Sequence, residues 1–344
     1  MEPPLDEEIQ LPASNTPSAP AQIKDYLRVV GLADADVALE PAGAGNMNCV
    51  WRARMPGRPS VILKQARAWV EKYPSIAAPV QRSEAEARFY RRIEQSPAVA
   101  AHMPRLLLHD ARSHLLVIED LEPAETCDNA YSGHSFTEAD LSQLAEWLGA
   151  LHAIQPLENE SDVFANREMR SLNHAHIFDL PLRIDGPFDA MLESVSPGLA
   201  VEAARVRSDP AYVAAVRRLG DRYLGECDVP RLLHGDLFPG SLLKRPDGKL
   251  WIIDPEFSFF GDPSFDIGVF AAHLVLSGHK PDLVTRWFEL HTANRERRQI
   301  SQAFAGVEIM RRLIGVAQLP LHLTLTEKAS LLSLSQQWVM SLEG

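Results

Sequence analysis

One segment, residues 232–257, places three of its four carboxylates at the two ends of a pair of apolar runs. Asp236 follows an apolar run in "LLHGDLFPGS", and Asp254 and Glu256 close a second apolar run in "KLWIIDPEF". An Asp-Gly pair between the two runs indicates a hairpin turn. Aspartates in loops often only form turns, but carboxylates at both ends of a hairpin also supply the hard oxygen ligands that a divalent cation prefers. The segment therefore predicts a metal-dependent site.

Composition limits the classes of protein that this chain can belong to. It has 344 residues, of which 46% are hydrophobic, enough for a large core. A net charge of −12 disfavours nucleic acid or an anionic membrane as the main partner. The three cysteines form no CxxC pair, which is typical of reduced thiols in the cytoplasm. No run approaches the ~18 apolar residues of a membrane helix. We expect a cytoplasmic protein. Composition leaves open whether the chain forms a homodimer.

The hydrophobic pattern predicts two lobes after a disordered arm. Residues 1–20 are rich in proline and acid, which favours disorder. Residues 21–121 read as a small β-rich lobe, and residues 122–344 as a large, mainly helical one. A cleft between two lobes is a common ligand site.

Within these lobes the pattern predicts individual elements. A capping box of Ser83 and Glu86 would start the helix at 80–95, and Thr137 would cap the next. The expected elements are helices at 21–32, 80–95, 264–278, 281–294, 296–319 and 325–341, strands at 37–41, 48–55, 60–65, 104–110 and 113–121, and short strands within 231–253.

A glycine turn lies between the first two strands. In "AGAGNMN" (42–48), Gly43, Gly45 and Asn46 leave backbone N–H groups free to bind an anion. A plain hairpin turn explains the same letters equally well. The chain contains no GxxxxGK[ST], so it is not a P-loop NTPase.

Lys64 stands inside the apolar strand "VILKQ" just beyond that turn. An edge-strand lysine that reaches water is one explanation. A buried lysine would need a carboxylate partner, and Glu84 or Glu86 on the following helix supplies one. Because Glu86 has a second role as the capping-box residue, we favour Glu84. Such a pair would hold the ammonium against phosphate oxygens, within about 10 Å of Asp254 if both serve one triphosphate.

The order of these features resembles the protein-kinase-like fold, and "HGD" resembles its small-molecule branch, the aminoglycoside phosphotransferases and choline kinases. The stretches "GAGNMNCVWR", "HGDLFPGS", "IDPEFSFFGDPSFDIG" and "RRLIG" resemble the 5-methylthioribose kinases in particular. The resemblance covers roughly residues 36–320. It implies an α+β bilobal kinase that uses ATP and Mg²⁺ to phosphorylate a hydroxyl of a small molecule.

The resemblance also assigns roles in the catalytic segment. It implies that Asp236 positions or deprotonates the acceptor hydroxyl and that Asp254 binds Mg²⁺. Ser241 stands where kinases carry a metal-binding Asn, and Glu256 would compensate as a second carboxylate ligand, as the Asp-x-Glu of methylthioribose kinases does.

Four further residues receive roles in the same way. Glu119 and Leu121 lie on the segment that offers its backbone to adenine. Asp266 resembles the buried aspartate that anchors the catalytic loop, and His234 is a loop anchor rather than a catalyst.

The acceptor site is less tightly specified. Arg311 and Arg312 resemble an arginine pair that methylthioribose kinases point into the active site, although a solvated basic patch is an alternative. Trp69 resembles a tryptophan that covers the ribose, or belongs to the core. Phe238 and Pro239 depart from the family's His-Thr, so a related sugar, or an aminoglycoside- or choline-type acceptor, stays open. A non-catalytic pseudokinase is the alternative of another class.

Overall fold

The structure is a computed structural model, and it describes residues 8–12, 21–33, 37–43, 47–184, 186–225, 227–291, 294–319 and 321–342. The chain divides into two compact units. Unit 1 comprises Met1–Ala124 with Trp251–Phe257, and unit 2 comprises Glu125–Leu250 with Ser258–Gly344. The segment Trp251–Phe257 thus groups with unit 1, although the sequence pattern put it in the second lobe.

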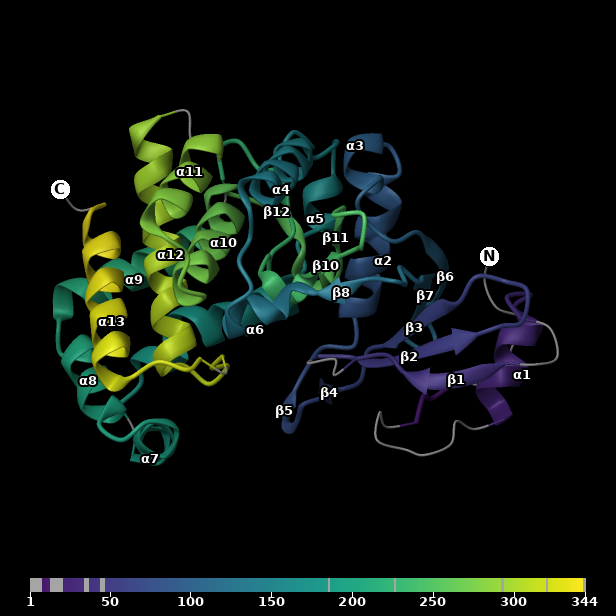
Figure 1. Ribbon diagram of the computed structural model, residues 1–344, viewed down its shortest axis with the longest axis horizontal. Helices are drawn as coiled ribbons and strands as arrows, with labels where there is room; N and C mark the ends of the chain where they lie inside the picture. Colours follow the sequence, from purple (N-terminus) through teal and green to yellow (C-terminus); the bar gives the residue numbers. More distant parts are fainter. Residues whose placement is uncertain are drawn as a thin grey trace. The chain divides into compact units, whose positions relative to one another are not determined.

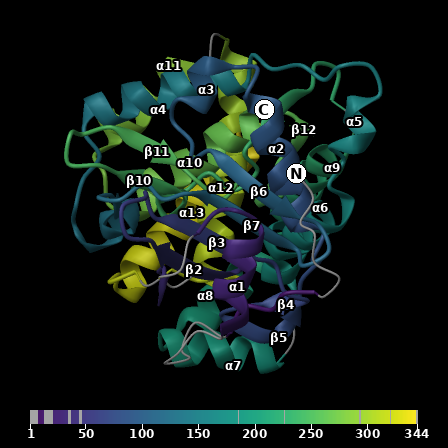
Figure 2. The same ribbon diagram turned by 90° about the vertical axis from the view of Figure 1, so that its right-hand side faces the viewer.

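Unit 1 is built on an antiparallel sheet of five strands, in the order β1-β2-β3-β7-β6. All five predicted strands are confirmed, and Figure 2 shows β2, β3 and β7 side by side. Lys64 lies on the central strand β3, opposite Val50 of β2 and Leu116 of β7. The bounds are β1 Ala38–Pro41, β2 Cys49–Arg54, β3 Val61–Gln65, β6 Leu106–Asp110 and β7 Leu115–Glu119.

The described part of the predicted disordered arm is ordered instead. Ile9 and Leu11 are buried in the core of unit 1. The backbone N–H of Ile9 donates to Ser113 Oγ, and that of Leu11 donates to Gln65 Oε1. Alternating apolar residues let this short segment bury its side chains on one side. The remainder of the arm, residues 1–7 and 13–20, lies outside the described residues.

Helix α2 (Arg82–Ile93) supplies the acidic partner of Lys64, but the predicted capping box is wrong. Its N-cap, Gln81, makes no side-chain cap bond, and Ser83 Oγ donates to Val80 O. Glu86 pairs with Lys64 instead, because a buried ammonium binds a carboxylate more strongly than a backbone N–H does. Unit 1 also contains α1 Ala21–Val29, β4 Trp69–Val70, β5 Tyr73–Ala77, α3 Pro97–Ala100 and the 3₁₀ turn η5 Pro255–Phe257.

Unit 2 is mainly helical, as predicted, and Thr137 caps α4 through a capping box with Asp140. Its elements are β8 Glu125–Thr126, η1 Cys127–Ser132, α4 Glu138–Leu151, α5 Glu160–Val163, α6 Arg167–His174, η2 Ala175–Asp179, η3 Leu180–Leu182, α7 Gly186–Val195, α8 Leu199–Arg207, α9 Pro210–Leu224, β9 Arg231–Leu233, η4 Pro239–Ser241, β10 Leu242–Lys244, β12 Phe259–Gly261, α10 Ser264–Leu276, α11 Pro281–His291, α12 Arg295–Ile314 and α13 Leu325–Met340. Strand β11 (Leu250–Ile252) crosses the division between the units.

The core of unit 2 brings together the arginine pair, Arg311 and Arg312, and the loop of residues 234–241, which we call the catalytic loop after the role expected from the sequence. Helix α12 packs against both α10 and α13 (Figure 1). Gly268 of α10 lies so close to α12 that a β-carbon there would clash with the carbonyl oxygen of Ser301. Strand β9, which leads into the catalytic loop, pairs antiparallel with β12, which leads into α10. This packing fixes the loop and the two helices as one body.

Candidate active site

The ammonium of Lys64 lies between two carboxylates of unit 1. Its Nζ is 2.7 Å from Glu86 Oε2 and 2.7 Å from Asp254 Oδ1. The side chains of Lys64 and Glu86 are 4% and 1% exposed, whereas that of Asp254 is 44% exposed. The expectation that Lys64 and Asp254 lie within about 10 Å is met. We call Lys64, Glu86 and Asp254 the lysine cluster.

Charge and burial oppose each other inside the lysine cluster. Burial alone would lower the pKa of Lys64, but the nearby carboxylates, Asp254 foremost, raise it well above its ordinary value. Burial raises the pKa of Glu86 despite the opposing charge of Lys64. Lys64 is therefore cationic at any physiological pH and suited to bind an anion.

Glu84, the partner that we favoured from the sequence, does not reach Lys64. Its Oε1 pairs with Arg88 Nη2 on the helix surface at 3.3 Å, and its side chain is 57% exposed. Residues two apart on a helix point about 200° away from each other. Because Glu86 faces the sheet, Glu84 faces solvent.

Asp254 has an unusual backbone conformation. Its φ of +64° lies in the left-handed region, which disfavours residues other than glycine. Such a conformation costs on the order of 1–3 kcal/mol and is concentrated at functional sites. The segment turns sharply here, between β11 and η5, with the Asp254 carboxylate against the ammonium of Lys64.

Two residues that sequence reasoning missed hold Glu256. Glu256 is 4% exposed, and its Oε2 accepts a hydrogen bond of 2.7 Å from Asn48 Nδ2. Arg82 Nε donates to Asn48 Oδ1 at 2.9 Å and lies 3.5 Å from Glu256 Oε2. Arg82, fully buried, also donates to the carbonyl oxygens of Met47, Arg67 and Pro79. It therefore links the glycine turn, the start of α2 and Glu256.

The glycine turn is described only in part. Gly43 has a φ of +75°, as a tight turn requires, while Gly45 and Asn46 lie outside the described residues. Trp69, on β4, is 37% exposed and therefore not a core residue. The guanidinium of Arg67 lies 5.7 Å from the centre of its ring.

Glu119 and Leu121 are the two residues expected to offer backbone groups to adenine. Glu119 is the last residue of β7, and Leu121 lies in the segment that follows. The Glu119 carboxylate is 3.3 Å from Arg105 Nε, and its backbone N–H donates to Arg105 O at 2.9 Å. Leu121 is buried.

In unit 2, both guanidinium groups of the arginine pair reach Asp236. Asp236 Oδ1 is 3.4 Å from Arg311 Nη2 and 3.8 Å from Arg312 Nη2. Arg311 and Arg312 are 5% and 8% exposed. The alternative of a solvated basic patch is therefore wrong, and α12 presents both residues to the catalytic loop.

Asp266 and His234 make the contacts of loop anchors. The Asp266 carboxylate accepts from the backbone N–H groups of His234 (2.9 Å) and Gly235 (3.0 Å), and His152 Nε2 lies 3.1 Å away. Burial opposes ionisation of Asp266, yet the contact with His152 and these N–H groups lower its pKa. His234 is fully buried.

Ser241 holds the catalytic loop together. Its hydroxyl accepts from the backbone N–H of Phe238 at 3.0 Å, and lies 2.8 Å from Phe238 O and 3.3 Å from Asp236 O. A hydroxyl has one proton to donate, and here backbone carbonyls are its acceptors. These contacts favour a loop-capping role over the metal-ligand role expected from the sequence.

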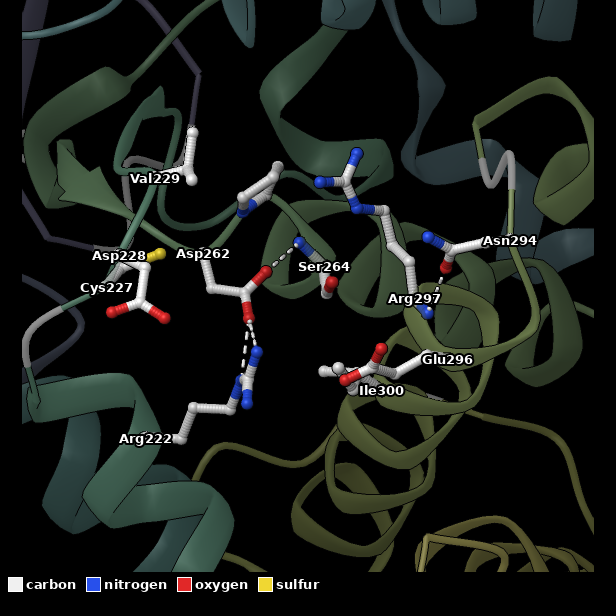
Figure 3. A pocket seen from close by; sticks show the side chains of 11 residues that line it. Arg222, Cys227, Asp228, Val229, Asp262, Ser264, Asn294, Glu296, Arg297 and Ile300 are labelled. Carbon is white, nitrogen blue, oxygen red and sulfur yellow. Dashed lines mark hydrogen bonds and ion pairs between the residues drawn. The ribbon is translucent and has the colours of Figure 1, made fainter.

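A separate hollow of about 270 Å³ in unit 2 contains none of these residues. Figure 3 shows that the ion pair of Arg222 with Asp262 crosses it, while Asp262 also accepts from the backbone N–H of Ser264 at the start of α10. Asp262 is thus committed to structural contacts.

Two features are absent from the described residues. No described helix is long and apolar enough to cross a membrane. Within the same residues, no three His, Cys, Asp or Glu side chains come together as a metal site.

Methylthioribose kinases are among the known proteins whose sequences are similar to this chain. A methylthioribose kinase of Yersinia enterocolitica is 30% identical over 273 residues, which are 75% of this chain and 65% of that protein. One from Yersinia pseudotuberculosis is 31% identical over 274 residues, 75% of this chain and 64% of that protein. The chain therefore spans slightly less than two thirds of the length of these curated relatives.

Solved structures share the fold at low sequence identity. A spectinomycin phosphotransferase in complex with ADP and spectinomycin has a TM-score of 0.57 at 13% identity, over 95% of this chain and 99% of that one. The choline kinase LicA from Streptococcus pneumoniae has a TM-score of 0.54 at 17% identity, over 93% and 98%. The protein-kinase-like α+β fold is thus confirmed. Residues 39–300 match the phosphotransferase enzyme family, and the chain belongs to that family.

Proposed function

We propose that the chain is an ATP-dependent kinase that transfers the γ-phosphate to a hydroxyl of a sugar-like acceptor, with 5-methylthioribose or a close relative as the preferred substrate. The observation that carries the proposal is the lysine cluster, in which a buried ammonium is held by Glu86 and remains in contact with the more exposed Asp254. The methylthioribose kinases that resemble the chain over 75% of its length support the acceptor.

The residues of unit 1 fit ATP and Mg²⁺. Lys64 carries a permanent positive charge for phosphate oxygens. The Asp254 carboxylate is a hard oxygen ligand with nearly half of its surface exposed, and Mg²⁺ in such enzymes is held by one or two carboxylates together with the phosphates. Glu256 is the second carboxylate. Mg²⁺ bound there would offset the negative charge that develops on the transferred phosphoryl group.

Asp236 acts on the acceptor. Its carboxylate orients the acceptor hydroxyl and accepts its proton as the oxygen attacks phosphorus. Asp266 and Ser241 hold the loop that carries Asp236. Positioning of this kind provides most of the rate enhancement in phosphoryl transfer.

The arginine pair favours a neutral or anionic acceptor. Arg311 and Arg312 put two guanidinium groups beside Asp236, and a cation next to them is repelled. Guanidinium groups instead donate hydrogen bonds to hydroxyl oxygens. The arrangement therefore supports a sugar over the aminoglycoside- or choline-type acceptors. The intact Lys64, Asp236 and Asp254 argue against the pseudokinase alternative.

A magnesium-dependent turnover assay tests the proposal. Purified protein is given ATP and Mg²⁺ with 5-methylthioribose, ribose, choline or an aminoglycoside, and ADP release is measured with Asp236→Asn as the blank. We expect turnover with 5-methylthioribose well above that of the Asp236→Asn blank. Turnover only with choline or the aminoglycoside would refute the acceptor class. ATP binding without turnover on any acceptor would favour the pseudokinase.

A further inference from the structure

A buried acid that the proposed function leaves unused lies beneath the arginine pair. Glu308, in the middle of α12, is 1% exposed. Its Oε2 accepts a hydrogen bond from Arg311 Nε, and its Oε1 accepts one of 2.8 Å from Arg312 Nε. The two arginines follow Glu308 by three and four residues, so the helix itself brings all three side chains to one face.

Each guanidinium group is therefore held at one end and directed at the other. The Nε atoms bind Glu308, and the Nη2 atoms of Arg311 and Arg312 lie 3.4 and 3.8 Å from Asp236 Oδ1. Arg312 Nη1 also donates to Ala317 O at 3.3 Å. A planar guanidinium group anchored through Nε has little freedom left to rotate. Glu308 thus sets the direction in which both arginines present their outer N–H groups.

A histidine and a tyrosine support Glu308 from behind. His273 Nε2, on α10, lies 3.1 Å from Glu308 Oε1, and His273 Nδ1 lies 2.6 Å from Tyr131 Oη. Burial lowers the pKa of His273 to about 4 despite the hydrogen bond with Glu308, so the imidazole is neutral near pH 7. The carboxylate can only accept, which assigns the single proton to Nε2 and makes Tyr131 the donor to Nδ1. The donors therefore run from Tyr131 through His273 to Glu308.

The charges in this group balance. Glu308 and Asp236 are two anions, and Arg311 and Arg312 are two cations. Burial would raise the pKa of Glu308, but the two arginines hold it well below its ordinary value. If Glu308 lost its charge, Asp236 would be the one carboxylate left among these four residues. Both buried guanidinium groups would then bind Asp236 in place of an acceptor hydroxyl.

We propose that Glu308 is a positioning residue for the acceptor site. It anchors the arginine pair and prevents the two arginines from binding Asp236 in place of an acceptor hydroxyl, and it is itself oriented by His273 and Tyr131. The proposal rests on the proposed function, because it describes how the same site is kept ready for an acceptor. It predicts that the Glu308 charge affects the acceptor half of the reaction and leaves nucleotide binding intact.

The test compares Glu308→Gln with Asp140→Asn. Asp140 is a buried acid of unit 2 that pairs with Lys244 and completes the capping box of α4, and no role in the reaction is assigned to it. For each variant, kcat and the KM values for acceptor and ATP are measured and kcat is divided by the number of ADP-binding sites. This normalisation removes losses that are due only to unfolding.

For Glu308→Gln we expect kcat/KM for the acceptor to fall about 100-fold, as small misplacements at an active site do, with KM for ATP unchanged. Asp140→Asn should keep the wild-type values per ADP-binding site. A Glu308→Gln enzyme within threefold of wild type, or a fall that Asp140→Asn shares after normalisation, would overturn the proposal.

A second variant keeps the proposal testable if Glu308→Gln does not fold. Tyr131→Phe removes only the hydroxyl that orients His273, and we expect it to lower kcat/KM for the acceptor about 3- to 10-fold. Unchanged kinetics in this variant would also overturn the proposal.

The arrangement can also be followed without turnover. The Nε–H protons of Arg311 and Arg312, observed by NMR, should exchange slowly with water in the wild type and faster in the Gln or Phe variant. Slow exchange in both variants would contradict the anchoring role. If the wild type phosphorylates no acceptor, the proposed function fails, and the NMR result still decides the role of Glu308.

Discussion

Exchange of Glu86 for glutamine should destabilise unit 1 far more than the same exchange of Glu84. Glu86 is buried and lies 2.7 Å from Lys64 Nζ, whereas Glu84 is on the surface with Arg88. Both changes replace a carboxylate by an amide on the same helix, two residues apart. The pair therefore isolates the effect of the buried contact from any change in helix propensity.

The magnitude follows from burial. Breaking one partner of a buried ion pair costs about 3–5 kcal/mol. Asp254 stays 2.7 Å from the ammonium, and glutamine still offers an acceptor oxygen, so we expect the lower end, about 3 kcal/mol, for Glu86→Gln. A surface pair one turn apart contributes about 0.5 kcal/mol or less, which is the limit for Glu84→Gln.

The assay is urea unfolding of the whole chain, with ATP affinity measured alongside. Glu86→Gln should unfold at a clearly lower urea concentration and bind ATP at least about tenfold more weakly, because the ammonium is no longer held in place. Glu84→Gln should match the wild type in both. Equal unfolding midpoints for the two variants would refute the assignment of Glu86 as the partner of Lys64.

Three further predictions concern the carboxylates and a histidine. Asp236→Asn should lower kcat by about 10²–10⁴ while ADP still binds, and retention of more than about a tenth of the activity would contradict its role. Glu256→Gln should raise the Mg²⁺ concentration needed for half-maximal turnover at saturating ATP, and an unchanged value would leave Glu256 a purely structural partner of Asn48. Burial lowers the pKa of His291 to about 3, so the unfolded state takes up its proton first as pH falls and stability declines below about pH 6.5. Between pH 6.5 and 5 this decline is about 2 kcal/mol, and His291→Gln should remove it when urea unfolding is compared at pH 7 and pH 5.

The elements of the fold follow from local pattern. The five strands of unit 1 and the four final helices were predictable because apolar residues repeat with the periods of strand and helix. The order of residues 8–12 is not predictable from composition, because proline and acid dominate the whole arm, whereas the short alternation of Ile9 and Leu11 is what buries the segment.

The polar contacts were harder to predict, because they join residues far apart in the chain. Arg82 reaches Asn48 and Glu256 across separations of 34 and 174 residues, and no local pattern encodes such a contact. Glu308 did leave a signal. A single acid inside the apolar run "FAGVEIM", followed by arginines at the third and fourth positions, indicates a buried acid with its own partners.

The candidate site residues of each unit meet the same problem, with opposite signs of charge. In unit 1 a cation, Lys64, lies between two carboxylates, and in unit 2 an anion, Asp236, lies between two guanidinium groups. A buried charge without a partner would be too costly to keep, and a charge fully bound by its partners would have nothing left to bind a ligand. In each unit one partner is fully buried: Glu86 for Lys64, and Glu308 for the arginines. Under the proposed function, the contact with the more exposed partner, Asp254 or Asp236, is the one that a phosphate oxygen or an acceptor hydroxyl replaces. A functional group with one fully buried partner and one more exposed partner stays ionised, oriented and available, which the transfer of a phosphoryl group requires.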